Sequence, residues 1–302
     1  MWGALTLQSG YNAALVSIGA MLLGAAAGAV GSFLYLRRRS LVSDAMAHAT
    51  LPGVGLAFLA MVALGGDGRF LPGLLIGAGL SAALGLWCVQ RLVRGRVAED
   101  AAIGAVLSTF YGAGIVILTL IQGLRVGSPA GLEGFLLGST AGMLRADAIV
   151  IGVGGAGVAL ALWVMRRPLA IVAFDAGHAQ GMGIAPARMD AALMVLALAV
   201  VLIGLQVVGL VLVVALLITP AVAARMWTNR VGHVALIAAA IGGAAGYVGA
   251  ATSAAVPDLP TGPVIVMLCF AAFAVSALFA PERGIIARAI RRARVGGLHF
   301  GR

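Results

Sequence analysis

Two side chains that can bind a metal ion, Asp44 and His48, stand four residues apart at the start of an apolar run over residues 40–59. Positions i and i+4 lie on one face of a helix. A carboxylate with an imidazole suits Mn, Fe or Zn better than Mg or Ca, which prefer shells made only of oxygen. A carboxylate inside a membrane costs about 2.5–3.5 kcal/mol on insertion scales, so it is rarely accidental. The pair therefore predicts a metal site, and two ligands suit a step on a transport path better than a permanent cofactor.

A second interpretation of the same residues needs no metal. Ser43 and Asp44 are residue types that cap helix N-termini, and His48 could be a core histidine with satisfied hydrogen bonds. The residues alone leave both interpretations open.

The composition requires a membrane around these residues. The 302 residues are 62% apolar and only 10% charged, and the mean hydropathy is +1.10, whereas soluble domains carry about 25% charged residues. We expect an all-α, polytopic membrane protein, with a run of 36 residues from 189 to 224 divided in two, because one helix would be about 54 Å long in a core of about 30 Å. The predicted spans are residues 12–36, 41–64, 70–93, 101–121, 146–165, 191–206, 207–224, 234–253 and 264–280.

The basic residues predict the orientation of these nine spans. The chain has 20 arginines and no lysine. With the N-terminus outside and the C-terminus in the cytoplasm, 17 of the 20 arginines lie in inner loops or the tail, which is the positive-inside pattern. We therefore attribute the net charge of +10 to membrane topology and expect no nucleic-acid partner.

The loops offer no second domain and no nucleotide site. We expect one transmembrane domain over residues 1–302, because no GxxxxGK[ST] motif occurs and the chain has no lysine to complete one. The protein is thus not expected to be an enzyme. The longest inner loop, about 169–190, can form a short amphipathic helix at 177–182 that suits docking of a cytoplasmic partner, although a solvated loop remains an alternative. A basic cytoplasmic tail over residues 281–302 carries six arginines that suit anionic lipid.

Six motifs in order along the chain resemble the metal-ion permease family of bacterial ABC importers, the membrane subunits for zinc, manganese or iron. The most specific is RRRSLVSDAMAHATLPGVGLAFL, which contains the pattern D-x-x-x-H-x-x-x-P-G from Asp44 to Gly53. The others are EDAAIGAVLSTFYGAGIVIL, FLLGS, FDAGHAQGMGI, LQVVGLVLVVALLITPAVAAR and PTGPVIVML. One departure is Ser43, where many relatives have glycine.

The resemblance implies a fold like that of the permeases of vitamin B12 and siderophore importers, in a bacterial cell membrane. It implies a path made with a second copy of the chain, an extracytoplasmic metal-binding protein, and cytoplasmic ABC ATPase subunits. Asp44 and His48 would contact the divalent metal in transit, and no cofactor would be bound permanently. The ATPase would dock on residues 174–184, where the matching positions are Phe174, Asp175, Gly177, Ala179, Gly181 and Gly183.

Other functions remain as alternatives. A permease of the same fold for a metal chelate or cobalamin would have a polar lining without metal ligands. A self-contained secondary transporter or channel would show an inverted repeat, and none is evident. An intramembrane metalloprotease would need HExxH or a similar helix pair, whereas Ala-Thr follows His48. The arginines at 37–39 place the pair in the inner half of the path, unless the second helix begins deeper in the membrane.

Overall fold

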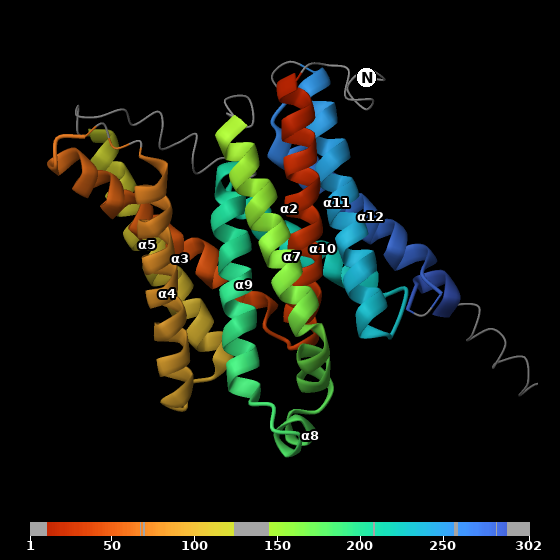
Figure 1. Cartoon of the computed structure of the whole chain (residues 1–302). Coiled ribbons are helices and arrows are strands. Elements are labelled where there is room, and N and C mark those ends of the chain that lie inside the picture. Colours follow the sequence, from red (N-terminus) through yellow and green to blue (C-terminus); the bar gives the residue numbers. More distant parts are fainter. Residues whose placement is uncertain are drawn as a thin grey trace, which may run out of the picture.

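Every regular element in the described part of the chain is an α-helix (Figure 1). The structure, a computed structural model, describes residues 11–66, 68, 70–123, 145–207, 209–256, 259–281 and 283–288. The helices are α2 (Tyr11–Leu36), α3 (Ser40–Ala63), α4 (Leu71–Arg94), α5 (Glu99–Gly123), α7 (Arg145–Phe174), α8 (Ala176–Gly181), α9 (Pro186–Val207), α10 (Leu210–Arg225), α11 (Val231–Ala255) and α12 (Thr261–Phe279).

Most of these helices are long and apolar enough to cross a bilayer. Among the described residues, eight helices meet this criterion, and α10 contributes a shorter apolar helix. The expected polytopic, all-α protein with about nine transmembrane helices is therefore confirmed. The expected division of the run 189–224 also occurs, between Val207 and Leu210. Gly209 there has φ 80°, which favours glycine and lets the chain leave one helix and enter the next.

Helix α2 is the centre of one group of helices, because it packs against α7, α10 and α11 (Figure 1). Small residues allow the closest of these approaches. A Cβ atom on Gly24 would overlap the backbone of Gly242 on α11, and one on Gly28 would overlap the backbone of Ala238. Glycine at these positions lets two helix backbones meet without side chains between them, as is common in membranes.

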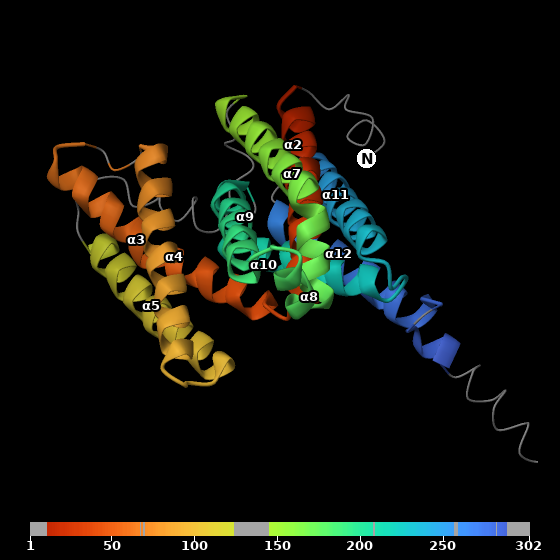
Figure 2. The ribbon, with the colours of Figure 1, turned by 60° about the horizontal axis from the view of Figure 1, so that its bottom comes forward.

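A second group consists of α3, α4 and α5, which pack together on the other side of α9 (Figure 2). Helix α3 runs obliquely through the structure and links the groups. Its first residues lie next to the end of α2, and its far end lies at the outer side of α4 and α5. Helix α9 contacts α7 and α2 as well as α3 and α4, so it is the element that both groups share.

The predicted fifth span is wrong at its end. We expected it to close at Arg166, Arg167 and Pro168, but α7 continues through Pro168 to Phe174. Proline removes one helical hydrogen bond, but the next turn is apolar, and its Leu169 and Val172 are buried against the rest of the molecule. This packing keeps the chain helical, so the inner loop between α7 and α9 is shorter than the expected 169–190.

Two sequence expectations lie outside the described residues. The FLLGS motif at 135–139 is one. The basic tail is the other, beyond residue 288.

Candidate functional site

Helix α3 begins before the acid, which excludes the capping interpretation of Asp44. The N-cap residue is Arg39, with no side-chain capping bond, and Asp44 is the fifth helical residue. The Ser43 hydroxyl donates to the Ser40 carbonyl at 2.6 Å and caps nothing. The interpretation of Ser43 and Asp44 as helix caps is therefore wrong, and Asp44 needs another role.

The structure brings Asp44 and His48 together on one face of α3. Nε2 of His48 lies 3.4 Å from Oδ1 of Asp44, and the side chains are 18% and 34% exposed, respectively. The other ring nitrogen, Nδ1, is buried and has no hydrogen-bond partner among the described residues. A buried polar atom without a partner is costly, so His48 is not a satisfied core histidine. The unpartnered nitrogen and the partly exposed carboxylate make the pair a candidate for binding a cation.

Proline four residues after His48 adds a further free acceptor. In a regular helix the amide of residue 52 would donate to the carbonyl of residue 48. Pro52 lies inside α3 and has no N–H to donate. The carbonyl of His48 therefore lacks the amide partner that an uninterrupted helix would give it. A carbonyl oxygen is a suitable ligand or orienting group for a hydrated divalent ion.

Small residues let α4 and α5 pack closely against this part of α3. A Cβ atom on Gly55 would lie 2.5 Å from Ile117, and one on Gly114 would lie 2.5 Å from the Cβ atom of Leu51. On the α4 side, Gly53 meets the backbone of Gly77. The close packing of α4 and α5 thus explains Pro52 and Gly53 of the D-x-x-x-H-x-x-x-P-G pattern. This packing also fixes the direction in which the face with Asp44 and His48 points.

Tyr111 on α5 is a neighbour of the site that sequence reasoning missed. Its ring meets the His48 ring edge to face, with centroids 5.2 Å apart and an interplanar angle of 88°. The two residues are 63 positions apart in the chain, so spacing gave no signal. The contact restricts the orientation of the imidazole, which a metal ligand requires.

Removing the Tyr111 ring should weaken metal uptake. An edge-to-face pair contributes about 0.5–1.5 kcal/mol, so Tyr111→Ala should raise the half-saturating metal concentration roughly three- to tenfold. Tyr111→Phe, which keeps the ring, is the matched control and should behave as wild type. Uptake measured against metal concentration provides the comparison. If the phenylalanine variant were as impaired as the alanine variant, ring packing would not be the reason.

The predicted docking segment forms a separate feature at the end of the structure opposite the start of α2 (Figure 1). Asp175 caps α8 by accepting from the His178 amide at 2.9 Å, and Ala179 is buried. The Ile184 amide donates to the Ala179 carbonyl at 2.9 Å. Gly183 has φ 79°, a conformation that side chains other than glycine rarely adopt. The helix is short but held at both ends.

Two large apolar side chains of this segment are exposed beside its polar residues. Phe174 is 74% exposed and Met182 is 57% exposed. Gly177 and Gly181 leave the backbone of α8 uncovered, because a Cβ atom at Gly181 would meet nothing within 4 Å. Exposed apolar side chains around a rigid turn are typical of a protein-binding surface.

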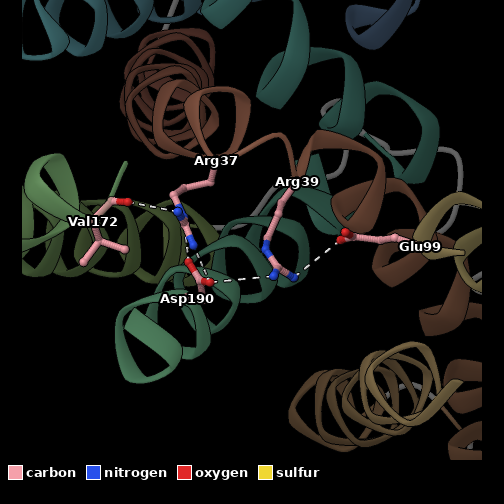
Figure 3. Close-up of polar contacts among 5 residues, drawn as sticks. All are labelled: Arg37, Arg39, Glu99, Val172 and Asp190. Atoms are coloured by element: carbon pink, nitrogen blue, oxygen red, sulfur yellow. Dashed lines mark hydrogen bonds and ion pairs between the residues drawn. The ribbon is translucent and has the colours of Figure 1, made fainter. Parts of the chain in front are cut away.

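Charged residues connect the start of α3 with the segments on either side of α8 (Figure 3). Arg37 donates from Nε to Oδ1 of Asp190 at 2.8 Å and from Nη2 to Oδ2 at 2.7 Å. Its Nη1 donates to the Val172 carbonyl at 2.9 Å. Arg39 lies 3.7 Å from Asp190 and 3.5 Å from Glu99. We call Arg37, Arg39, Glu99 and Asp190 the junction cluster.

The described residues place no third candidate ligand beside Asp44 and His48. In the described residues no group of three or more His, Cys, Asp or Glu side chains could hold an ion. Cys88 and Cys269 are both free. Asp44 and His48 therefore remain a pair of candidate ligands on α3, and the junction cluster lies between this helix and the segments beside α8.

The long apolar helices around this site are those of a membrane protein, and the comparisons with known proteins agree. The model of the ABC 3 transport family matches residues 11–280. The chain belongs to this family. A relative is the manganese transport system membrane protein MntC of Bacillus subtilis, 41% identical over 98% of this chain and 67% of that protein. Another is the zinc transport system membrane protein TroC of Treponema pallidum, 38% identical over 98% of both.

A solved structure has the same architecture as this member of the ABC 3 transport family. It is PsaBC from Streptococcus pneumoniae in complex with a Fab. The TM-score is 0.81 at 29% identity, and the match covers 97% of this chain and all of that one. The fold is thus that of ABC importer permeases, as the sequence motifs implied, and the protein is a transport subunit rather than an enzyme.

Proposed function

We propose that the chain is the permease subunit of an ATP-binding cassette importer that moves a divalent transition metal ion, Mn, Zn or Fe(II), into the cell. The observation that carries this proposal is the pair on α3, with Asp44 and His48 3.4 Å apart and Nδ1 of His48 buried without a partner. Relatives whose names specify manganese and zinc support the same class of substrate.

The incomplete ligand set suits transit rather than storage. Two protein ligands leave several coordination positions to water, so the ion can leave again. A second copy of the chain, related by a twofold axis, would bring the same pair to the path. Carboxylate and imidazole groups bind Mn, Zn and Fe(II) alike, so the substrate is specified only as a divalent transition metal ion. The ion is transported, and no cofactor is bound permanently.

Energy must come from partner chains. The sequence has no lysine and no nucleotide-binding loop, so ATP would be hydrolysed by separate subunits. These cytoplasmic ABC ATPase subunits would dock on α8. Phe174 and Met182 would fill an apolar pocket of the ATPase, while Asp175, Gly177, Ala179, Gly181 and Gly183 keep the turn in shape. An extracytoplasmic metal-binding protein would deliver the ion to the opposite face.

The orientation follows from the same assignment. With nine membrane crossings, the N-terminus lies outside and the C-terminus in the cytoplasm, on the side of α8. This is a multi-pass protein of a bacterial cell membrane, one transmembrane domain over residues 1–302. The basic tail from 281 to 302 would lie on anionic lipid. The arginines on the cytoplasmic side serve membrane topology and docking of the ATPase. No nucleic-acid partner is proposed.

Reconstitution tests the proposed function. Vesicles containing this chain with the ABC ATPase that co-purifies with it should accumulate Mn²⁺ or Zn²⁺ only when ATP and the metal-binding protein are present. Vesicles with this chain alone should accumulate none, because it has no energy source. ATP-independent accumulation by the lone chain would contradict the proposal and indicate a secondary transporter. Uptake of cobalamin or a metal chelate in place of the ion would indicate the other permease class.

A further inference from the structure

A single side chain, Arg37, holds both segments that flank the docking helix α8. Val172 lies three residues before Asp175, the cap of α8, and Asp190 lies in the second turn of α9, which follows α8. Arg37 donates to the Val172 carbonyl and to both carboxylate oxygens of Asp190 (Figure 3). A planar guanidinium is suited to such a two-pronged contact. A movement of α8 therefore has to involve Arg37.

Arg37 also stands at the base of the helix that carries the metal ligands. It lies between the end of α2 at Leu36 and the start of α3 at Ser40. Asp44 is four residues beyond Ser40, which is about 6 Å along a helix. The helical hydrogen bonds of this first turn make it move as a unit. A displacement of Arg37 would thus reach Asp44 within little more than one turn.

Arg39 broadens the connection to α5. Its Nη2 lies 3.7 Å from Oδ2 of Asp190, and its Nη1 lies 3.5 Å from Oε1 of Glu99 in the first turn of α5. A cavity of about 340 Å³ borders Arg39, Glu99 and Asp190. The cavity leaves room for α5 and α9 to shift while the charged side chains stay in contact.

The pair is poorly explained as a stabilising contact alone. The side chains of Arg37 and Asp190 are only 18% and 17% exposed. Buried ion pairs often contribute little net stability, because desolvation offsets their attraction, and apolar replacements can be as stable. What a directional charged pair provides is a defined arrangement of the elements it joins. Here those elements are the docking segment and the base of the metal-binding helix.

We propose that Arg37 and Asp190 are positioning residues that transmit movement of the ATPase-docking helix α8 to α3, and so couple ATP hydrolysis to release of the metal from Asp44 and His48. This inference rests on the proposed function, because it needs the ATPase to dock on α8. It assigns a role to two residues that touch neither the metal nor the ATP.

Measuring metal transported per ATP hydrolysed tests the inference. The reconstituted complex with its ATPase and metal-binding protein is compared with the same complex carrying Asp190→Asn, which keeps the shape but removes the charge. We expect ATP hydrolysis to stay within about twofold and Mn²⁺ transported per ATP to fall about tenfold, the range of a typical coupling free energy. Mn²⁺ binding without ATP should be unchanged, since Asp44 and His48 are intact.

Matched variants separate coupling from folding. Asp100→Asn neutralises an exposed acid beside Glu99 that is outside the junction cluster, and it should behave as wild type. Arg37→Lys keeps the charge but cannot hold both Asp190 oxygens and the Val172 carbonyl at once, so it should also lower the ratio. The double variant Arg37→Asp with Asp190→Arg exchanges the two charges. It should restore part of the Mn²⁺ transported per ATP that the single variants lose.

The outcomes distinguish this inference from the proposed function. If the wild-type complex shows no ATP-dependent Mn²⁺ uptake, the proposed function fails and the inference with it. If the wild type transports and Asp190→Asn keeps the wild-type amount of metal per ATP, only the inference is overturned. If Asp190→Asn does not assemble, Arg37→Lys decides: a lowered ratio supports coupling, and an unchanged ratio overturns it.

Discussion

Replacing both Asp44 and His48 by alanine should abolish metal uptake while the complex still assembles. The two residues are the candidate metal ligands on α3, and Nε2 of His48 lies 3.4 Å from Oδ1 of Asp44. Loss of groups that only orient ligands already costs about 10- to 100-fold in metal affinity. Loss of the ligands themselves should therefore lower uptake by at least about 100-fold. Uptake of radioactive Mn²⁺ or Zn²⁺ by a transport-deficient strain provides the measurement.

A nearby substitution controls for folding in that experiment. Ser43 is buried next to the pair, but its hydroxyl bonds only to the Ser40 carbonyl in the same helix turn. Ser43→Ala should leave uptake within about twofold of wild type, because the lost bond is local to the helix. Normal uptake by the Asp44→Ala and His48→Ala variants would show that the ion takes another path.

A single methyl group at Gly24 should destabilise the whole protein. A Cβ atom there would overlap the carbonyl oxygen of Gly242, so α2 and α11 would have to separate. Overpacking of this kind typically costs about 1–3 kcal/mol for Gly24→Ala, and Gly24→Leu should prevent folding. Thermal unfolding of the purified complex in detergent, together with its yield, provides the measurement.

Gly157 on α7 is the matched control, because a Cβ atom there would meet nothing within 4 Å. Gly157→Ala should leave the unfolding temperature unchanged or raise it slightly, because alanine favours the helix more than glycine does. Equal stability of the Gly24→Ala and Gly157→Ala variants would mean that α2 and α11 are farther apart than the structure shows.

Much of the fold could be predicted from the sequence because membrane helices leave strong local signals. The apolar runs predicted the spans to within a few residues in most cases, and the length of the run 189–224 predicted its division. The error at Pro168 arose because proline is a local signal, whereas the burial of Leu169 and Val172 that keeps α7 helical is a tertiary one.

The candidate site was predictable in part for the same reason. Asp44 and His48 are one helical turn apart, so their spacing indicated a common face. Tyr111 is brought to His48 only by the packing of α5 on α3. Arg37 and Asp190 are 153 residues apart. Positive charge beside a membrane span predicts orientation, and it gave no indication that Arg37 has a buried partner.

The oblique course of α3 means that a rotation of the helix about its first residues would move its far end much more than Asp44 and His48. Its 24 residues make it about 36 Å long, with Asp44 about 6 Å and His48 about 12 Å from Ser40. A pivot of about 10° at the base would move the far end by about 6 Å but Asp44 by only about 1 Å. Metal–ligand distances tolerate about 0.2 Å. In the proposed permease, one small rotation of α3 would therefore be enough to break the contacts of Asp44 and His48 with the ion.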